Sequence, residues 1–454
     1  MSSLNTSLAT ALSGLMAEQG ALEATTNNVA NVNTPGYSRQ VPVMVTRDPV
    51  VQDHLTFGTG VKLERLESIR DAILDSQIQQ ETQTQGHLGA LVAALSETQT
   101  NFTSTTGDIG TAISKFFDSI NQLSTNPADL SLRQNVLTAA GNVGAAFNLA
   151  STRLTAQRTN LDASAQQTVG QINQLTKQIA QLNQQISNLQ NAGDNPGTFI
   201  DQRTQLIDQL SSLIDVSVIP TDNTVTLTTS SGTALVAGQQ SFQLSTQLDS
   251  SGVQHIFSQG TDITSRIVSG QLGGVLETRD RQIPGIQSQL DTLAAGLANA
   301  VNQVQAGGFD RNGNAGTNLF NPPPASGAAA SLSVALTDPS LVAASSDGIA
   351  GDNGNAEALY ALRNQAIVNG ETPTDYYSGI VFNVGNASAN AKAEQSASDL
   401  VLQQLNDQRA SVSGVSLDQE AANMMRYQQA YAASAQVISS INSMMQTVIN
   451  MKNS

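Results

Sequence analysis

The sequence predicts a mainly α-helical fold, in which both chain ends form a long helical-bundle and coiled-coil core and a small β domain is inserted. Apolar residues recur at helical spacing over most of the chain, including both ends. The spacing changes to a period of two only between about residues 216 and 268. The chain has 454 residues, too many for one compact core, and this length alone suggests about three domains.

The first predicted helix runs from about residue 3 to residue 33. Its apolar stripe stops at Thr34-Pro35-Gly36-Tyr37, where Pro35 cannot continue a helix and Gly36 can adopt the positive φ of a tight turn. The stripe consists of Leu4, Leu8, Ala11, Leu15, Leu22, Val29 and Val32.

The last predicted helix, within residues 412–454, carries two adjacent apolar rows. Such a face is wider than a two-helix contact requires, which indicates a helix with more than one neighbour. One row contains Leu417, Ala421, Met424, Tyr431, Ala435, Ile438, Met445 and Ile449, and the other contains Val437, Ile441, Met444, Val448 and Met451.

Both ends are nearly free of charge. Residues 1–38 carry two glutamates, and residues 412–454 carry Asp418, Glu420, Arg426 and Lys452. Little repulsion therefore opposes association. Two interpretations stay open from the periodicity alone: the ends pack against other molecules, or they pair with each other in an ordinary monomeric bundle.

Between the ends, short extended pieces are expected over 40–51 and 57–66. Helices are expected over 68–101, 108–126, 130–191 and 199–214. If it is helical throughout, segment 130–191 is a rod ~90 Å long, at 1.5 Å per residue. The break at 192–197 then predicts an antiparallel helical pair.

The second half of the chain begins with the inserted β module. Helical spacing resumes at 269–306, and residues 307–356, rich in Gly, Ala, Ser, Asn and Pro, are expected to form a loop-rich surface segment. Further helices are predicted over 357–367, 376–384 and 389–411. Ser416 is the expected N-cap of the last helix, with Gln419 at the reciprocal position.

Composition excludes several classes of protein. The net charge of −16, without any Lys/Arg cluster, opposes binding to nucleic acid or to an anionic membrane. Cysteine is absent, which excludes disulfides and thiolate metal sites. No basic signal segment and no membrane-spanning run is found, so we expect a cytosolic protein or one exported without a cleaved signal peptide.

No motif supports catalysis, and we expect no enzyme activity, cofactor or metal. The stretch from Asp310 to Asn314 is similar to a calcium loop but lacks the glycine and glutamate of an EF-hand, which favours an Asn/Gly turn. His54, His87 and His255 lie far apart and are expected in surface or packing roles. Paired carboxylates such as Asp201 and Asp208 are expected on solvated helical surfaces.

A few residues in the weakly charged ends invite more specific interpretations. Arg39 and Arg426 are isolated cations, suited either to a solvated surface or to a partner on another subunit. Tyr37, Tyr427 and Tyr431 can each bury a ring while the hydroxyl group finds a hydrogen-bond partner.

Both ends carry the sequence signatures of a known family. Ser13-Gly14-Leu15, Asn27 to Asn31 and Asn33-Thr34-Pro35-Gly36-Tyr37-Ser38-Arg39-Gln40 resemble the N-terminal signature of the bacterial flagellar rod and hook axial proteins. The run from Ser413 to Tyr431 is similar to the C-terminal signature of the hook-associated members, and hook and rod proteins usually differ there. Interior stretches at 270–280 and 308–316 are also similar to those members.

The resemblance implies a structural role in the flagellum. It implies axial helices of an inner tube at 1–40 and 412–454, a helical bundle domain at 41–214 with a long coiled-coil hairpin, the β module at 215–268, a returning helix at 269–306 and outer or bundle segments at 307–411. It further implies a homo-oligomeric ring at the hook–filament junction, outside the cell. The implied partners are the hook protein, a second hook-associated junction protein and an export chaperone on the C-terminal helix, after export through the flagellar type III apparatus.

We therefore predict that the protein is a junction subunit whose ends fold as copies assemble. The alternatives are a hook or distal-rod subunit, or a secreted hydrolase that carries flagellar export ends. The predicted assembly interface consists of Leu4, Leu8, Leu15, Leu22, Val29, Tyr37, Arg39, Leu417, Met424, Arg426, Tyr431, Ile438, Ile441, Met445 and Val448.

Overall fold

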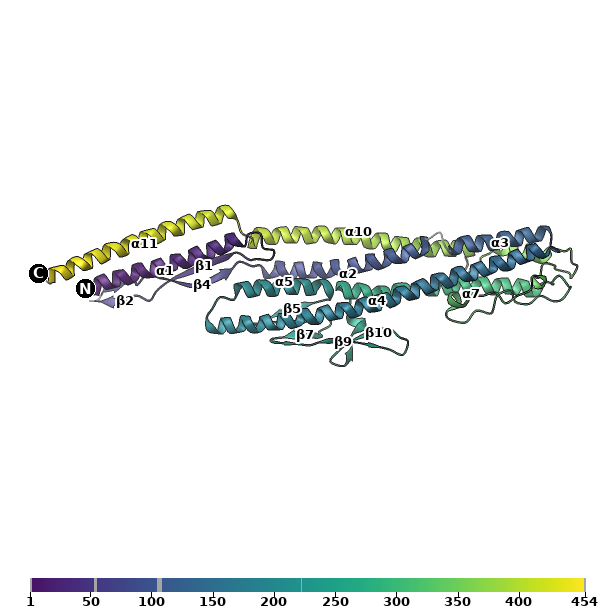
Figure 1. Cartoon of the computed structure of the whole chain (residues 1–454), viewed down its shortest axis with the longest axis horizontal. Coiled ribbons are helices and arrows are strands. Elements are labelled where there is room, and N and C mark those ends of the chain that lie inside the picture. Colours follow the sequence, from purple (N-terminus) through teal and green to yellow (C-terminus); the bar gives the residue numbers. More distant parts are fainter. Residues whose placement is uncertain (1, 53–54, 104–107, 222, 453–454) are drawn as a thin grey trace.

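The computed structural model describes residues 2–52, 55–103, 108–221 and 223–452. The molecule is elongated, and Figure 1 shows two parts that follow one another along its length. We call the part that holds both chain ends the axial unit, and the part from α2 to α10 the helical domain. The mainly helical fold with a small inserted β region agrees with the prediction.

The axial unit consists of two long helices and two hairpins. Helix α1 (Ser2–Ala30) and helix α11 (Leu417–Lys452) lie side by side and run in opposite directions, so that both chain ends lie at the extremity of the molecule (Figure 1). Strands β1 (Gln40–Thr46) and β4 (Val61–Ser68) pair antiparallel and pack on α1. Strands β2 (Val50–Gln52) and β3 (Leu55–Phe57) form a second hairpin.

The axial unit is larger than the sequence predicted. A domain boundary was expected at residue 40, yet β1 and β4 belong with α1. Small residues explain the close packing: a Cβ atom added at Gly20 would lie 2.6 Å from the Leu63 side chain, and one added at Gly60 would overlap Ser13. Spacing alone does not show that these glycines face a strand.

The helical domain is built around one very long helix. Helix α4 (Leu130–Ala192) has 63 residues and packs against the shorter α5 (Gly197–Leu213), so the predicted rod and its antiparallel partner are confirmed. The remaining helices are α2 (Ala72–Thr103), α3 (Ile109–Thr125), α6 (Gly270–Glu277), α7 (Ile283–Gly307), α8 (Ala328–Ser331), α9 (Gly354–Ala361) and α10 (Pro373–Ser413), with a π-helical turn at Thr278–Gln282 between α6 and α7.

Local chemistry sets several of the helix ends. The Asp108 and Asp129 side chains accept hydrogen bonds from the first turns of α3 and α4, which satisfies backbone groups that have no partner within the helix. Gly193 ends α4 with a φ of +80°, in the left-handed region where glycine has no Cβ penalty. At α11, the Ser416 Oγ atom lies 3.5 Å from the Gln419 backbone nitrogen, while the Gln419 side chain bonds Arg39 instead of returning to the cap.

One prediction for the second half of the chain is wrong. Residues 376–411 form a single helix, α10, because the glycine and asparagine residues at 385–386 do not interrupt the backbone hydrogen bonds. Segment 307–356 is loop-rich as predicted, but it is not confined to the surface. It contributes Phe320, Val342 and Ala344 to the core, where Phe320 lies 5.9 Å, centroid to centroid, from Phe116. A segment with few apolar residues can still contribute to a core, because the few that it has pack inside.

The β module is held on α4 by two buried or half-buried asparagines. Asn173 exchanges two hydrogen bonds of 2.8 Å with the backbone of Leu244, and Asn183 donates to the carbonyl groups of Val225 and Gly238. A four-stranded antiparallel sheet contains, in order, β5 (Ser217–Pro220), β6 (Val225–Thr228), β7 (Ala234–Ala237) and β8 (Gln240–Ser241). A three-stranded sheet contains, in order, β11 (Thr261–Asp262), β10 (Gln254–Ser258) and β9 (Leu244–Leu248).

A fully buried arginine completes the attachment of the β module. Arg279, in the π-helical turn, donates 2.7 Å to Asp162 of α4, 2.6 Å to the carbonyl group of Gln254 in β10, and bonds both oxygens of Asp280. Because one guanidinium group joins three elements, it fixes the module against both α4 and the turn before α7.

The motifs considered for metal binding have ordinary partners. Asp310 accepts hydrogen bonds from the backbone of Asn312 and Asn314, which confirms the Asn/Gly turn. His87 pairs with Glu277 and His255 with Asp262, while His54 lies outside the described residues. Within the described ranges, no cluster of three or more candidate ligands for a metal ion occurs, and none of the helices is long and apolar enough to cross a membrane.

Candidate assembly interface

Helix α11 packs against α1, and its more buried positions include one row of residues spaced by seven. This row is Glu420, Tyr427, Ser434 and Ile441, of which Glu420 and Ile441 are buried and the other two half-buried. A Cβ atom added at Gly14 would lie 3.3 Å from the Ser434 hydroxyl oxygen, so small residues let the two helices approach closely. The two chain ends therefore pair with each other, but they do so outside the main bundle.

The predicted interface residues include Ile441 of that row and Met424, Ile438 and Met445 of the row beside it. Glu420, Tyr427 and Ser434 are not among them, because polar and aromatic residues do not register as part of an apolar repeat. Ile441 is buried; Leu4, Leu8, Leu15, Leu22, Val29, Tyr37, Arg39, Met424, Ile438 and Met445 are half-buried; and Leu417, Arg426, Tyr431 and Val448 are exposed.

Helix α11 also presents large apolar side chains to solvent. Those that are 41–71% exposed are Leu417, Met425, Val437, Met444, Val448, Ile449 and Met451, of which Val437, Met444 and Met451 are spaced by seven and form one exposed apolar row. An apolar groove of about 650 Å³ adjoins this face, between α1, α11 and the β2–β3 hairpin. Its walls are small or apolar residues, among them Thr10, Ala11, Phe57, Ala433 and Val437. Soluble proteins rarely leave such continuous apolar surface uncovered.

The few charges of the axial unit interact weakly. The Arg426 guanidinium group stays on its own helix, where it bonds Asn423 and lies 5.0 Å from the Tyr427 ring centroid. Burial raises the pKa of Glu18, and the Arg426 charge only partly offsets this effect. Glu18 Oε2 is buried and accepts no hydrogen bond from the described residues. No ion pair between the described parts of α1 and α11 fixes their register.

Tyr37 and Arg39 lie where the axial unit meets the helical domain. The Tyr37 hydroxyl group donates 2.9 Å to the Asn28 side chain, which in turn exchanges two hydrogen bonds with the backbone of Gln40. Burial, together with the charges of Asp201 and Glu420, raises the pKa of Tyr37 to about 12, so the hydroxyl group keeps its proton. The Arg39 guanidinium group donates to the Gln419 side chain at the start of α11.

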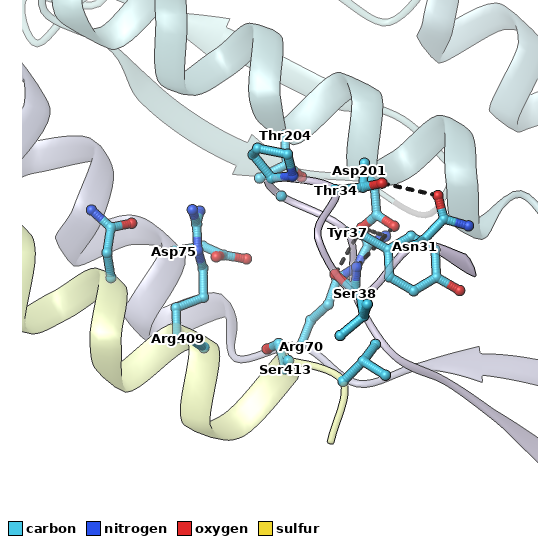
Figure 2. Close-up of a pocket in the computed structure, with 17 residues that line it drawn as sticks. Asn31, Thr34, Tyr37, Ser38, Arg70, Asp75, Asp201, Thr204, Arg409 and Ser413 are labelled. Carbon is cyan, nitrogen blue, oxygen red and sulfur yellow. Dashed lines mark hydrogen bonds and ion pairs between the residues drawn. The ribbon is translucent and has the colours of Figure 1, made fainter. Parts of the chain in front are cut away.

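A polar cavity of about 230 Å³ lies at this meeting point, which we call the joint (Figure 2). It is lined by the loop 31–38, by Arg70 and Asp75, by Asp201 and Thr204 of α5, and by the last turn of α10. Asp201 accepts hydrogen bonds from Ser38 and pairs with Arg70 at 2.5 Å. In Figure 2, Asp201, Ser38 and Arg70 lie together at the loop, whereas Asp75 and Arg409 lie apart from it.

The aspartates of α5 correct the expectation that they are solvated. Asp201 is buried, and Asp208 is largely buried beside Arg409 at 3.2 Å. Burial raises the pKa of both carboxyl groups, to about 6 for Asp208, although the neighbouring arginines oppose this shift. Their seven-residue spacing puts them on one face of α5. The sequence does not show that the loop 31–38 and α2 cover this face in the fold.

Comparison with known proteins gives consistent results along the whole chain. Residues 95–320 match the family model for the flagellar hook-associated protein FlgK helical domain. Residues 8–37 match the flagella basal body rod protein model, and residues 407–451 match the model for the C-terminal part of the flagellar basal body rod FlgEFG proteins.

Curated relatives and a solved structure extend over most of the molecule. The chain is 32% identical to flagellar hook-associated protein 1 of Bacillus subtilis, over 99% of both chains. It is 28% identical to the protein of the same name from Escherichia coli, over 97% of this chain and 99% of the relative. The fold is similar to the flagellar hook junction protein FlgK from Burkholderia pseudomallei, with a TM-score of 0.67 and 20% identity over 74% of this chain and all of the other.

Proposed function

This chain belongs to the flagellar hook-associated protein 1 family, and we propose that it is a structural subunit of the junction between flagellar hook and filament, formed by folding coupled to self-assembly. The family consists of structural flagellar proteins and not of enzymes. Hook and rod subunits are the weaker alternative, because the rod models match only the two ends whereas relatives named hook-associated protein 1 match the full length.

One observation carries the assembly mechanism: α11 packs against α1 and leaves the apolar row of Val437, Met444 and Met451 exposed. Burying a side chain such as Val448 or Ile449 contributes roughly 1.5–3 kcal/mol, and this gain is absent while the side chain faces water. Most of the stability of a helix in a protein comes from the packing of its apolar face. The axial helices are therefore disordered in the free subunit and become ordered when neighbouring copies cover the exposed row.

The proposal extends to the partners and the location. Copies form a ring, with the hook protein on one side and a second hook-associated junction protein on the other. An export chaperone shields the apolar row of α11 before assembly, and the subunit leaves the cell unfolded through the flagellar type III apparatus, without cleavage of a signal peptide. The predicted interface residues of α1 and α11 then line contacts between copies, while the β module faces outward.

Deletion of the gene tests the junction role. Cells without the protein should complete the hook but shed unpolymerised flagellin into the medium, because the filament has no base on which to grow. Normal filaments in the deletion strain would overturn the proposal.

Complementation with charged variants tests the interface. The double variant Val437→Asp/Met444→Asp places two charges in the exposed row, and we expect it to behave like the deletion while the purified subunit keeps its melting temperature. Leu248→Asp, in exposed strand β9, is the matched control and should restore filaments. Full motility of the double variant would show that this row is not an interface.

Limited proteolysis of the free subunit tests the coupling between folding and assembly. Residues 2–30 and 417–452 should be cleaved well before residues 130–306. If the chain ends resist the protease as well as the helical domain does, folding is not coupled to assembly.

A further inference from the structure

The loop Thr34–Arg39 is held by the helical domain, although it directly follows the first axial helix. The carboxylate of Asp201 accepts hydrogen bonds from the Ser38 backbone nitrogen at 3.2 Å and from the Ser38 hydroxyl group at 2.7 Å (Figure 2). Arg70 donates to the same carboxylate and, at 2.9 Å, to the carbonyl group of Gly197. Asp201 and Ser38 are 5% and 7% exposed, so water does not compete for these bonds.

The backbone of Arg39 joins two further segments of the chain. Its nitrogen donates 2.9 Å to the carbonyl group of Ser413, the last residue of α10, and its carbonyl group accepts 2.9 Å from Ile69, just before α2. These hydrogen bonds need neither α1 nor α11 to be folded. The loop is therefore anchored to the helical domain through Ser38 and through the backbone of Arg39, in addition to the bonds of Tyr37 with Asn28 of α1 and of the Arg39 side chain with Gln419 of α11.

The tight turn before Ser38 is shaped to fit α5. Gly36 has a φ of +75°, and a Cβ atom there would lie 2.5 Å from the Gln205 side chain, which donates to the carbonyl group of Pro35. Any other residue would meet both the strained backbone angle and this contact. The Thr-Pro-Gly-Tyr-Ser sequence thus serves docking onto α5.

We propose that Asp201 is a positioning residue that keeps the loop Thr34–Arg39 docked in the free subunit, so that the joint is the template from which both axial helices fold during assembly. This inference rests on the proposed function, because it assumes that the helices are disordered before assembly. It adds that the ordered part of the free subunit ends at this loop, and that Asp201 fixes this boundary.

The template works through geometry. Residue 39, nine residues after the end of α1, and residue 413, four residues before the start of α11, are hydrogen-bonded neighbours at the joint. Folding of α1 proceeds from this point toward the N-terminus and folding of α11 toward the C-terminus, so the two helices form side by side. A fixed starting point also reduces the entropy cost of bringing together segments that are distant in sequence.

Amide hydrogen exchange of the purified full-length subunit tests the inference. In the native chain, amides of α1 and α11 should exchange nearly as fast as in an unstructured chain, whereas those of Ser38, Arg39 and Ile69 should exchange more than ~100-fold slower. The boundary of protection should fall within the loop and not at the start of α2.

Substitutions assign the boundary to Asp201. Asp201→Asn turns one acceptor into a donor facing Ser38 or Arg70, and we expect the protection of Ser38 and Arg39 to fall at least ~10-fold while α4 and α7 are unchanged. Ser38→Ala keeps the backbone donor and should show a smaller loss. Asp291→Asn is the matched control, because Asp291 accepts from the backbone of Gly327 and Ala329 within the helical domain, and it should leave the loop protected.

The outcomes separate the two proposals. Fast exchange at Ser38 and Arg39 in the native subunit, or unchanged protection in both Asp201→Asn and Ser38→Ala, overturns the template role and leaves the junction role standing. Slow exchange along α1 and α11 in the dilute free subunit overturns coupled folding itself.

Discussion

The helical domain and the axial unit use apolar residues in opposite ways. In the helical domain many large apolar side chains are fully buried, among them Phe116, Phe117, Phe147 and Phe320. In the axial unit the buried side chains of α1 are small, such as Ala17, Ala21 and Ala24, while the large ones of α11 face outward. Among the described side chains of α11, Ile441 is the one large apolar residue that is buried. One region thus completes its own core, and the other leaves its core to be completed by neighbours.

The largest expected effect is in the core of the helical domain. Phe116→Ala removes a ring that packs 5.3 Å from Phe117 and 5.9 Å from Phe320, so we expect the free energy of unfolding to fall by about 3–5 kcal/mol. The chain has no tryptophan, so urea unfolding is best followed by circular dichroism. Phe382→Ala, at a ring that is 67% exposed, is the control and should cost less than about 0.5 kcal/mol. Similar losses for both variants would refute the comparison.

The next effect contrasts a buried with an exposed ion pair. Asp162→Asn leaves the buried Arg279 with one carboxylate fewer, and we expect a loss of about 2–4 kcal/mol in the same unfolding experiment. Glu67→Gln in the axial unit removes a pair with Arg65 in which both side chains are largely in water, and should change stability by less than about 0.5 kcal/mol. Equal losses in the free energy of unfolding for the two variants would mean that ion pairs contribute equally to the stability of the two regions.

A smaller effect of opposite sign is expected at the joint. Because the pKa of Asp208 is raised to about 6 in the folded state, its stabilising contribution is present below about pH 4 and is lost as the pH rises through about 6. At pH 7.5, Asp208→Asn should therefore stabilise the subunit by about 1–3 kcal/mol, and at pH 4 it should have little effect. Thermal unfolding at both pH values checks this. Stabilisation that is the same at pH 4 and pH 7.5 would exclude the titration of Asp208 as its cause.

The smallest effect is expected within the axial unit. Ile441→Ala in a closed core would cost about 2–5 kcal/mol, but in the free subunit we expect less than about 1 kcal/mol, because the axial pair has so little core of its own. The unfolding curve of the free subunit measures this. A cost comparable to that of Phe116→Ala would show that α1 and α11 are already a stable pair before assembly.

The elements of the helical domain could be predicted because their spacing is regular and local. The approximate bounds of α4 and α5 follow from the apolar repeat and the glycine-containing break, which are local features of the sequence. The division of α10 into two predicted helices failed because glycine lowers helix propensity without preventing a helix that is packed on one side. Local preference was there outweighed by tertiary contacts.

The joint could not be predicted in the same way. Ser38 and Asp201 are 163 positions apart, and nothing in the pattern around Asp201 distinguishes a covered carboxylate from a solvated one. The predicted interface omits Glu420, Tyr427 and Ser434 of α11 for a related reason, since these residues are not apolar. Hydrophobic periodicity finds cores, whereas polar docking sites emerge only when distant segments are placed together.

Both chain ends lie at the same extremity of the molecule, within the surface proposed to contact other copies, and this has a practical consequence. A purification tag or fluorescent reporter fused to either end would add bulk where subunits must meet. The turn at Ser251–Gly252, between β9 and β10, is exposed and far from the axial unit. A short epitope inserted there is the better way to visualise the protein in living cells, because loop tips of this kind tolerate added residues.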